Sequence, residues 1–266
     1  MAAEQPKITL HWLNGSRAHS ILWLLEELQV PYETKVYHRQ SSGLAPPELE
    51  KVHPLGKSPV VTVTVPGSSE PVVLAESGFI FTYLCEHFGQ AKTLVPQQWK
   101  EGQDGKLLGE TEAWMRYQYL MYYIEGSFMP VLVQYLILSA LKSNQVPFLI
   151  RPISGAIANK IISMMIFPNI KKHFAMLEQQ LATSGGDFIT GTELTAADIQ
   201  LSYGLVASKD SLDHIGKWDK GTPKETYPKL FAYVDRLEQQ PGFQRAVEKT
   251  KEIDNGKFSI APKPSS

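Results

Sequence analysis

The stretch SPVVTVTVPGSSEPVVLAESG at residues 58–78 decides the fold of the first third of the chain. Its valine-rich parts, Val60 to Val65 and Val72 to Ala75, predict two strands, and the intervening PGSSEP predicts the turn of a hairpin. A hairpin brings Ser58-Pro59 at its start towards Glu76-Ser77 at its end. These polar ends suit a small molecule that has both a peptide backbone and a free α-amino acid end.

Strand and helix signals alternate on the N-terminal side of this hairpin. Ile8 to Trp12 predicts a strand, apolar residues at helical spacing from Ile21 to Leu28 predict a helix, and Tyr32 to Tyr37 predicts a second strand. Such a βαβ unit implies parallel strands with a right-handed crossover. A short helical start at Ala45 to Leu49 precedes the hairpin, and Gly78 to Phe88 predicts a helix after it. The order βαβ-α-ββα predicts a thioredoxin-like domain with a mixed four-stranded sheet over residues 1–90.

The remainder of the chain carries helical patterns alone. Residues 91–104 lack periodicity and are predicted to be a linker, and residues 256–266 a flexible tail. Residues 105–255 predict an all-helical bundle domain, with one long helix that continues past Pro130. Thr195 and Asp198 have the spacing of a helix capping box. The predicted fold class is therefore α/β plus all-α.

Composition limits the possible partners and compartments. The net charge of −1, with dispersed Lys and Arg, gives no electrostatic reason to expect nucleic acid or an anionic membrane as a partner. A single cysteine, Cys85, excludes an internal disulfide framework and favours a reducing compartment. The most apolar run, Phe128 to Leu141, is shorter than the roughly 20 residues of a membrane span. We therefore expect a cytoplasmic protein without a transmembrane segment, in which Cys85 is an inert core thiol.

Three motifs, in order, resemble those of the cytosolic glutathione transferase family: Pro54-Leu55-Gly56-Lys57-Ser58-Pro59-Val60, Glu76-Ser77 and Leu194-Thr195-Ala196-Ala197-Asp198. The resemblance extends from about Ile8 to Val247. Further short motifs are similar to those of the fungal subgroup typified by the yeast endoplasmic-reticulum-associated transferase: His11-Trp12-Leu13, Leu22-Trp23-Leu24-Leu25, Leu74 to Phe81 and Tyr123 to Ser127. The resemblance implies glutathione as co-substrate, no metal, a homodimer, and a cytoplasmic location with peripheral association with the endoplasmic reticulum.

The hairpin ends match the family's glutathione-binding residues. The family proline at the position of Pro59 is cis and turns the backbone of the residue before it towards the cysteinyl unit of glutathione. That preceding residue is usually valine in the family and is Ser58 here, a change that backbone pairing tolerates. Glu76 and Ser77 match the pair that binds the γ-glutamyl end. The alternatives are a trans proline that starts a strand and an ordinary helix cap at Ser77.

Basic and polar residues are candidates for the glycyl end of glutathione. The resemblance places Lys57 near the glycyl carboxylate, with a solvated surface lysine as the alternative. His53 falls where the family often has asparagine, and a structural role is an equal alternative. Arg39 is a further candidate for the same carboxylate.

The residue that activates the thiol is expected in the loop after the first strand, Asn14 to Arg17. Family members lower the pKa of the thiol with a Tyr, Ser or Cys donor in this loop, because a hydrogen bond to the thiolate favours the charged form. The loop contains no Tyr or Cys, so Ser16 is the first candidate. Asn14 or a backbone N–H is the next, and Arg17 adds positive potential. Ser16 as a plain helix cap is the alternative.

The acceptor substrate is expected in a cleft between the domains, beside the long helix. Tyr119, Tyr122, Tyr123 and Glu125 are the candidates for its lining. Aromatic residues at helical spacing also form cores and dimer interfaces, and that alternative stays open.

The predicted function is conjugation of the glutathione thiolate to small electrophilic acceptors. Two alternatives remain within the enzyme class: glutathione-dependent reduction of a hydroperoxide, and a carbon–sulfur bond-forming step in one pathway. A non-catalytic glutathione-binding module for regulation or assembly is the alternative from another class.

Overall fold

The computed structural model describes residues 5–88, 93–209 and 211–260, and the chain divides into two compact units. Unit 1 joins the residues up to Val95 to the segment that starts at Glu238, and unit 2 takes Pro96–Leu237. The sequence analysis placed the end of the helical domain at residue 255. In the structure the helical unit ends at Leu237, because the last helix belongs to unit 1. Residues 91–92 of the predicted linker and 261–266 of the predicted tail lie outside the described residues.

Unit 1 contains the predicted thioredoxin-like sheet, in the strand order β2-β1-β3-β4. β1 and β2 are parallel, while β1 pairs antiparallel with β3 and β3 with β4. The elements are β1 (Lys7–Leu13), α1 (Ala18–Leu28), β2 (Tyr32–Tyr37), the 3-10 helix η1 (Pro47–Lys51), β3 (Val60–Thr64), β4 (Val72–Ala75) and α2 (Ser77–His87). The predicted hairpin and βαβ unit are both confirmed.

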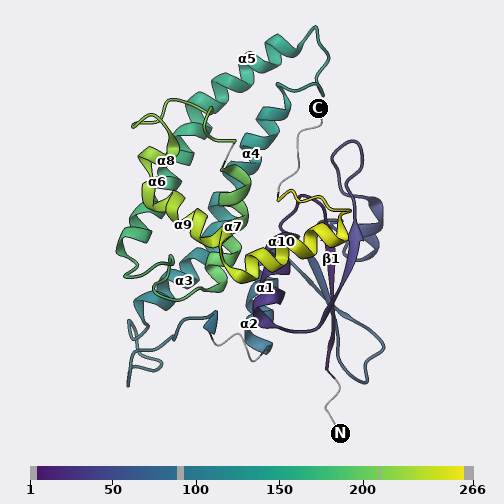
Figure 1. Cartoon of the computed structure of the whole chain (residues 1–266), viewed down its shortest axis with the longest axis vertical. Coiled ribbons are helices and arrows are strands. Elements are labelled where there is room, and N and C mark those ends of the chain that lie inside the picture. The colour runs from purple at the N-terminus through teal and green to yellow at the C-terminus, as the bar shows by residue number, and fades with distance from the viewer. Residues whose placement is uncertain (1–4, 89–92, 210, 261–266) are drawn as a thin grey trace. The chain divides into compact units, whose positions relative to one another are not determined.

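The last helix, α10 (Pro241–Ile253), completes unit 1 by packing on α1 (Figure 1). The ring of Phe243 meets that of Trp23 edge-on, 5.3 Å between centroids. Gly242 permits this approach, because a Cβ there would collide with the carboxylate of Glu27. Since α1 is apolar nearly all round and α10 covers its outer side, the segment assigned from sequence to the helical domain is structurally part of the first unit.

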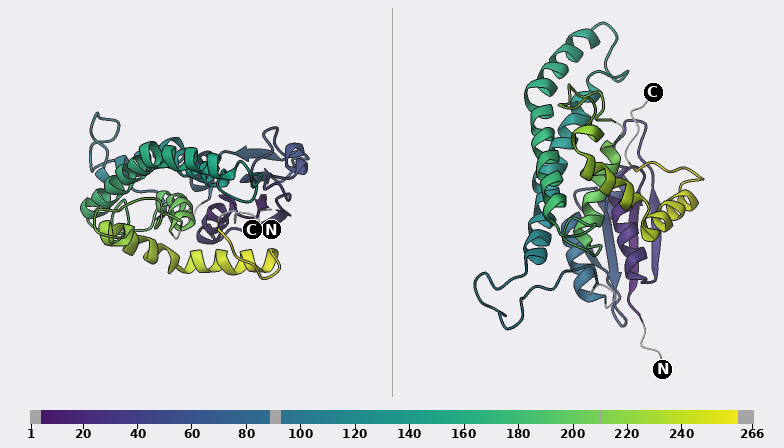
Figure 2. Two further views of the ribbon diagram at one scale, coloured as in Figure 1. Left: turned by 90° about the horizontal axis from the view of Figure 1, so that it is seen from above. Right: turned by 60° about the vertical axis from the view of Figure 1, so that its left-hand side comes forward.

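Unit 2 is built around two long helical rods that lie side by side (Figure 2). The first rod comprises α3 (Glu112–Tyr123), η3 (Ile124–Phe128) and α4 (Met129–Ala140), and the second comprises α5 (Arg151–Ile161), η4 (Ile162–Ile166) and α6 (Phe167–Thr183). The shorter helices α7 (Ala196–Ser208), α8 (Pro223–Thr226) and α9 (Pro228–Glu238) follow. The predicted long helix exists but begins at Glu112, and α5 was missed by the sequence analysis.

Each rod contains one π-helical turn, and in both cases it directly precedes an X-Pro pair. The turn at η3 ends before Met129-Pro130, with Met129 N–H bonded to the carbonyl of Ile124. The turn at η4 ends before Phe167-Pro168, with Phe167 N–H bonded to the carbonyl of Ile162. Proline has no N–H and its ring clashes with the carbonyl four residues earlier, so a locally wider turn accommodates it without ending the rod.

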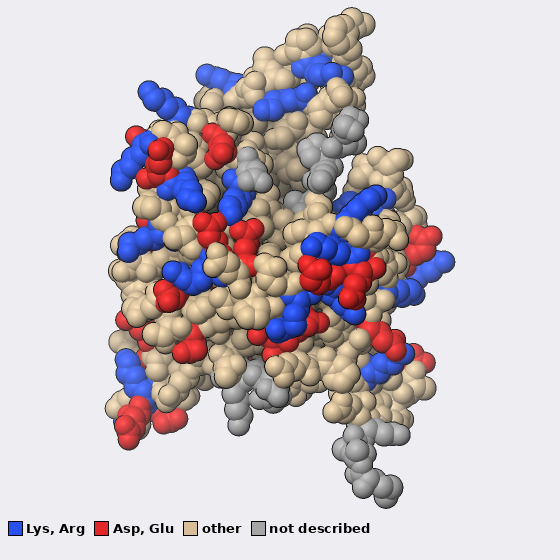
Figure 3. All heavy atoms as spheres, viewed as in Figure 1, with Lys and Arg blue, Asp and Glu red and all other residues tan. Residues whose placement is uncertain are grey.

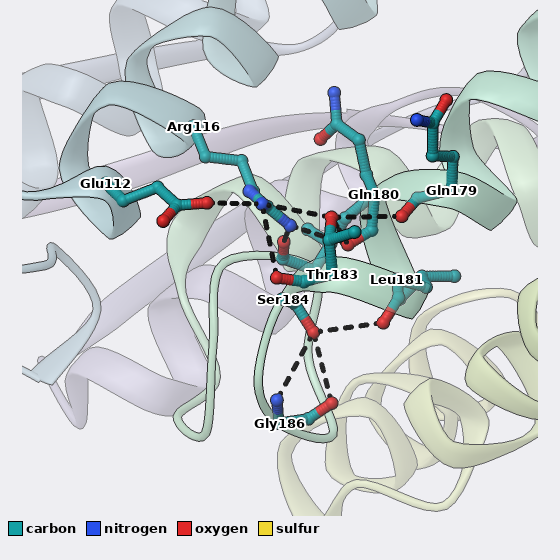
Figure 4. A network of polar contacts seen from close by, with 9 residues as sticks. Glu112, Arg116, Gln179, Gln180, Leu181, Thr183, Ser184 and Gly186 are labelled. Atoms are coloured by element: carbon teal, nitrogen blue, oxygen red, sulfur yellow. Dashed lines mark hydrogen bonds and ion pairs between the residues drawn. The ribbon is translucent and has the colours of Figure 1, made fainter.

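Arg116 joins α3 to the C-terminal end of α6 (Figure 4). Its Nη1 donates to the carbonyl of Gln180 at 2.6 Å, and its Nη2 donates to Oγ1 of Thr183 at 3.3 Å. Glu112, one turn earlier on α3, accepts from Nη2 at 2.9 Å. A cation at a helix C-terminus satisfies carbonyls that have no partner within the helix. Arg116 therefore fixes the N-terminal end of the first rod to the C-terminal end of the second.

The predicted capping box at the start of α7 is present and buried. The Asp198 carboxylate is fully buried and accepts from the backbone N–H of Thr195 at 2.8 Å and from that of Ile189 at 3.0 Å. The hydroxyl of Tyr233 on α9 donates to the same carboxylate at 2.7 Å. Asp198 is thus a junction between α7, the preceding loop and α9. Burial raises the pKa of this carboxyl, while these hydrogen bonds act in the opposite direction.

The two rods, Glu112–Ala140 and Arg151–Thr183, are long and apolar enough to cross a membrane by length and composition alone. Two such helices are weak evidence for a membrane span, and 33% and 22% of their apolar windows are buried inside the unit. One side of each rod builds the core of unit 2, where Leu120, Phe128 and Ile170 are completely buried. We therefore treat both rods as parts of a folded helical unit.

Candidate functional site

The sheet register brings three predicted site segments to one end of unit 1. His11 of β1 pairs with Val60 of β3, and Val60 pairs with Ala75 of β4. The loop after β1, the residues before β3 and the residues after β4 therefore lie at the same edge of the sheet. Direct contact confirms this, since Oγ of Ser16 lies 3.4 Å from Oγ of Ser58.

The peptide bond between Ser58 and Pro59 is cis, the geometry that the resemblance implied. Pro59 is buried and Ser58 is half-buried. The Ser58 hydroxyl donates to the carbonyl of His11 at 3.0 Å. The Ser58 side chain therefore anchors the residue before Pro59 to β1.

Glu76 and Ser77 stand where β4 ends and α2 begins. Glu76 is exposed and has a φ of 71°, a conformation that a residue with a Cβ rarely adopts. Strained backbone of this kind concentrates at functional sites. Within the described ranges, no hydrogen bond or ion pair engages the side chain of either residue. The first turn of α2 also offers free backbone N–H groups, which suit an anionic ligand group.

Ser16 is buried, and its hydroxyl makes two hydrogen bonds within its own loop besides the 3.4 Å contact with Ser58. Its hydroxyl donates to the carbonyl of Leu13 at 2.7 Å and accepts from the N–H of Ala18 at 3.2 Å. The second bond satisfies the first backbone N–H of α1, although Arg17, not Ser16, is the N-cap residue of this helix. To activate a thiol, the Ser16 proton would have to turn from Leu13 to the sulfur.

Asn14 and Arg39 hold the loop between them. Oδ1 of Asn14 accepts from the backbone N–H of Arg39 at 2.7 Å. The guanidinium of Arg39 donates to the carbonyls of Asn14, Gly15 and Gly43 at 3.1, 3.0 and 3.0 Å. These bonds give Arg39 a role in positioning the loop that its sequence context did not indicate.

The other predicted residues occupy different settings. Lys57 is exposed, and no hydrogen bond or ion pair of the described residues involves it. His53 accepts from the N–H of Leu55 through Nδ1 at 3.4 Å and is part of the turn that precedes Lys57. Arg17 is half-buried at the start of α1.

One polar residue next to the site was missed by the sequence analysis. His11 is buried in β1, with Nδ1 3.1 Å from the hydroxyl of Tyr37 on β2 and Nε2 3.2 Å from Oγ1 of Thr62 on β3. Burial, followed by the charge of Lys35, lowers the pKa of its imidazole. Only the strand register brings these three side chains together, and the sequence does not state that register.

The four predicted acceptor residues separate into two groups within unit 2. Tyr119 and Tyr122 are 49% and 79% exposed. Tyr123 is buried, and its hydroxyl lies 2.6 Å from Nδ1 of His173, which makes it part of the aromatic core of the unit. Burial, followed by Tyr119, raises the pKa of its phenol. Glu125, in the π-helical turn, is half-buried.

A cavity of about 550 Å³ lies elsewhere in unit 1, lined by residues of β2 and η1 that include Lys35, Tyr37 and Lys51. None of the predicted site residues lines it. In the described part of the chain, no cluster of three or more His, Cys, Asp or Glu side chains is arranged to hold a metal ion. Cys85 is buried in α2, as expected for a core thiol.

Comparisons with known proteins by family model, by sequence and by structure all find one family. Residues 6–86 match the family model described as glutathione S-transferase, N-terminal domain, and residues 158–250 match glutathione S-transferase, C-terminal domain. Glutathione S-transferase 1 of Saccharomyces cerevisiae is 31% identical over 93% of this chain and 97% of its own length. Glutathione S-transferase 3 of Schizosaccharomyces pombe is 29% identical over 97% and 96%. A solved glutathione S-transferase of Actinobacillus pleuropneumoniae superposes with a TM-score of 0.62 at 28% identity, over 95% of this chain and 97% of that one.

Proposed function

The chain belongs to the glutathione S-transferase family, and we propose that it conjugates glutathione to small electrophilic acceptors at the edge of the unit 1 sheet. The observation that carries this proposal is the convergence of the Ser16 loop, the cis Ser58–Pro59 bond and the start of α2. Each of these segments supplies one kind of group that glutathione requires.

In this proposal, glutathione binds mainly to side chains that have no hydrogen-bond or ion-pair partner among the described residues, and to backbone groups. The first turn of α2 and the hydroxyl of Ser77 receive the γ-glutamyl carboxylate, and the carboxylate of Glu76 accepts from the ammonium of the same end. The backbone of Ser58 pairs with the cysteinyl unit. Lys57 meets the glycyl carboxylate, while Arg39 and His53 support that side by holding their loops.

Ser16 is the residue that we assign to thiol activation. Donation from its hydroxyl stabilises the thiolate and lowers the pKa of the thiol. The thiolate attacks the electrophilic carbon, a carbon–sulfur bond forms, and the leaving group departs with its electron pair. The thiol proton goes to solvent. Arg17 adds positive potential, and Asn14 keeps the loop in place through Arg39.

The acceptor contacts the exposed side of α3 and η3 in this proposal. Tyr119 and Tyr122 offer accessible rings there, with Glu125 beside them. Tyr123 contributes by supporting Tyr119, whose ring stacks on it at 5.5 Å.

Capture and activity assays test the proposal. The purified chain should bind to immobilised glutathione and elute with free glutathione, and it should conjugate a chlorinated aromatic. Activity towards an organic hydroperoxide alone would favour the peroxidase alternative. Binding without either activity would favour the non-catalytic module, and failure to bind would refute the whole proposal.

Thiolate absorbance of bound glutathione tests the role of Ser16. Loss of a hydrogen bond to a charged group costs about 1.5–3 kcal/mol, so Ser16→Ala should raise the thiol pKa by about 1–2 units with binding largely retained. Ser42→Ala, an exposed serine of the same unit, is the matched control. If Asn14→Ala raises the thiol pKa and Ser16→Ala does not, the assignment is wrong.

Assembly and location complete the proposal. We propose a homodimer in the cytoplasm that associates peripherally with the endoplasmic reticulum. Light scattering of the purified chain measures its mass, and a monomer at micromolar concentration would contradict the first part. Fractionation of cells tests the proposed association with the endoplasmic reticulum.

A further inference from the structure

Charge is strongly segregated along this chain, in a way that its net charge of −1 conceals. Residues 126–177 contain five Lys and Arg and no Asp or Glu, so the rest of the chain carries −6. This segment forms the end of η3, α4, α5, η4 and most of α6. The end of unit 2 that carries α5 accordingly displays blue and tan spheres without red in Figure 3. The sequence-based argument against an anionic membrane was therefore incomplete.

The same end of unit 2 exposes large apolar side chains. We name residues 133–160, the helical hairpin formed by the adjoining parts of α4 and α5 with their loop, the hairpin end; it is distinct from the β3–β4 hairpin. Its most exposed apolar residues are Ile137 (59%), Phe148 (77%), Leu149 (85%), Ile150 (53%), Ile153 (65%) and Ile157 (55%). Ile150, Ile153 and Ile157 have the spacing of one helical stripe. Contiguous apolar surface of this kind marks an interaction site.

Hydrogen bonds fix the backbone that presents these side chains. The guanidinium of Arg151 donates to the carbonyl of Val146 at 2.9 Å and to Oδ1 of Asn144 at 2.9 Å. The hydroxyl of Ser154 donates to the carbonyl of Leu141 at 2.8 Å. The exposed residues therefore belong to an ordered hairpin rather than to an open loop.

We propose that the hairpin end docks this protein on the surface of an anionic lipid membrane. The apolar stripe enters the headgroup region, and Lys142, Arg151 and Lys160 remain at the level of the lipid phosphates. In the described residues, no carboxylate forms an ion pair with any of these three cations. Because the other sides of both rods build the core of unit 2, the protein lies on the membrane and does not span it.

The distribution of charge also favours a membrane over a second copy of the chain as the partner of the hairpin end. A twofold contact through the hairpin end would place the same three cations opposite each other without a carboxylate between them. An anionic bilayer instead attracts each cation and accepts the apolar side chains. The inference rests on the peripheral membrane association proposed above and names the surface that makes it, and it does not depend on the assigned catalytic residues.

Flotation of the purified full chain with lipid vesicles tests the proposal. The chain should float with vesicles of phosphatidylcholine and phosphatidylserine, float less with phosphatidylcholine alone, and bind more weakly at high salt. Phe148→Ser/Leu149→Ser should reduce the partition coefficient about tenfold or more. Lys142→Gln/Lys160→Gln should reduce it on the order of tenfold at low salt.

Leu44→Ser/Leu107→Ser is the matched control, because these residues are 68% and 94% exposed outside the hairpin end. It should float as the unaltered chain does. Absence of flotation, or equal losses in the hairpin and control variants, overturns the proposal. A change of molecular mass in Phe148→Ser/Leu149→Ser identifies a second copy as the occupant and overturns it as well. Glutathione capture and conjugation, measured without vesicles, report separately on the proposed function.

Discussion

Replacement of Asp198 by alanine should strongly destabilise unit 2. The carboxylate is completely buried and accepts four hydrogen bonds, from the N–H of Ile189, the N–H and hydroxyl of Thr195, and the hydroxyl of Tyr233. Alanine leaves these donors without an acceptor, and each buried unsatisfied group costs about 1–3 kcal/mol. Since hydroxyls can reorient and the two N–H groups cannot, we expect a total loss of about 3–5 kcal/mol.

Urea unfolding followed by circular dichroism measures this loss, and the corresponding fall in Tm is about 6–20 °C. Asp198→Asn retains one carbonyl oxygen, so it should cost about 1–2 kcal/mol. Tyr233→Phe removes one donor and should cost about 1 kcal/mol. The exposed Asp213→Ala is the control and should change stability by less than about 0.5 kcal/mol. A cost of less than about 1 kcal/mol for Asp198→Ala would refute the view that this carboxylate joins α7, the preceding loop and α9.

Three further predictions concern unit 1. Burial lowers the pKa of His19 to about 4 from 6.5. Between pH 6.5 and about 4 the unfolded chain therefore binds more protons than the folded chain, and the free energy of unfolding should fall as pH decreases through this range. A His19→Gln variant whose free energy of unfolding falls equally with pH would exclude this cause. Burial, followed by Glu86, raises the pKa of the Cys85 thiol to about 12, so iodoacetamide should modify it in urea but not in the native protein, as mass spectrometry would detect. Gly242→Ala should lower the free energy of unfolding by about 1–3 kcal/mol, because its Cβ would meet Glu27; an unchanged urea midpoint would show that α10 can shift away from α1.

Local signals account for what the sequence predicted well. The hairpin of β3 and β4 follows from β-branched runs around a Pro- and Gly-containing turn, and the Thr195–Asp198 box from the spacing of its two side chains. In contrast, α5 was missed because Pro152, Gly155 and several isoleucines give residues 151–161 a low intrinsic helix preference. Packing against the neighbouring rod outweighs that preference.

Long-range pairing accounts for most of what the sequence could not predict. The approach of Ser16 to Ser58 depends on the strand register, and the role of Arg39 depends on a loop conformation that brings three carbonyls to one guanidinium. The membership of α10 in unit 1 depends on the contact of Phe243 with Trp23. These contacts join residues that are distant in the chain, and helical periodicity carries no information about which partner a helix covers.

The position of α10 has a consequence for how this chain is made. Unit 1 is discontinuous, so α1 and the sheet leave the ribosome long before the helix that covers Trp23. At about 5–20 residues per second, synthesis from Val95 to the end of α10 takes on the order of 10–30 s. During that interval the outer side of α1 is uncovered, and unit 2 can fold first. Exposed apolar surface of this kind is prone to aggregation, so we expect the nascent chain to need chaperones, or rapid closure once its last helix emerges, to protect unit 1.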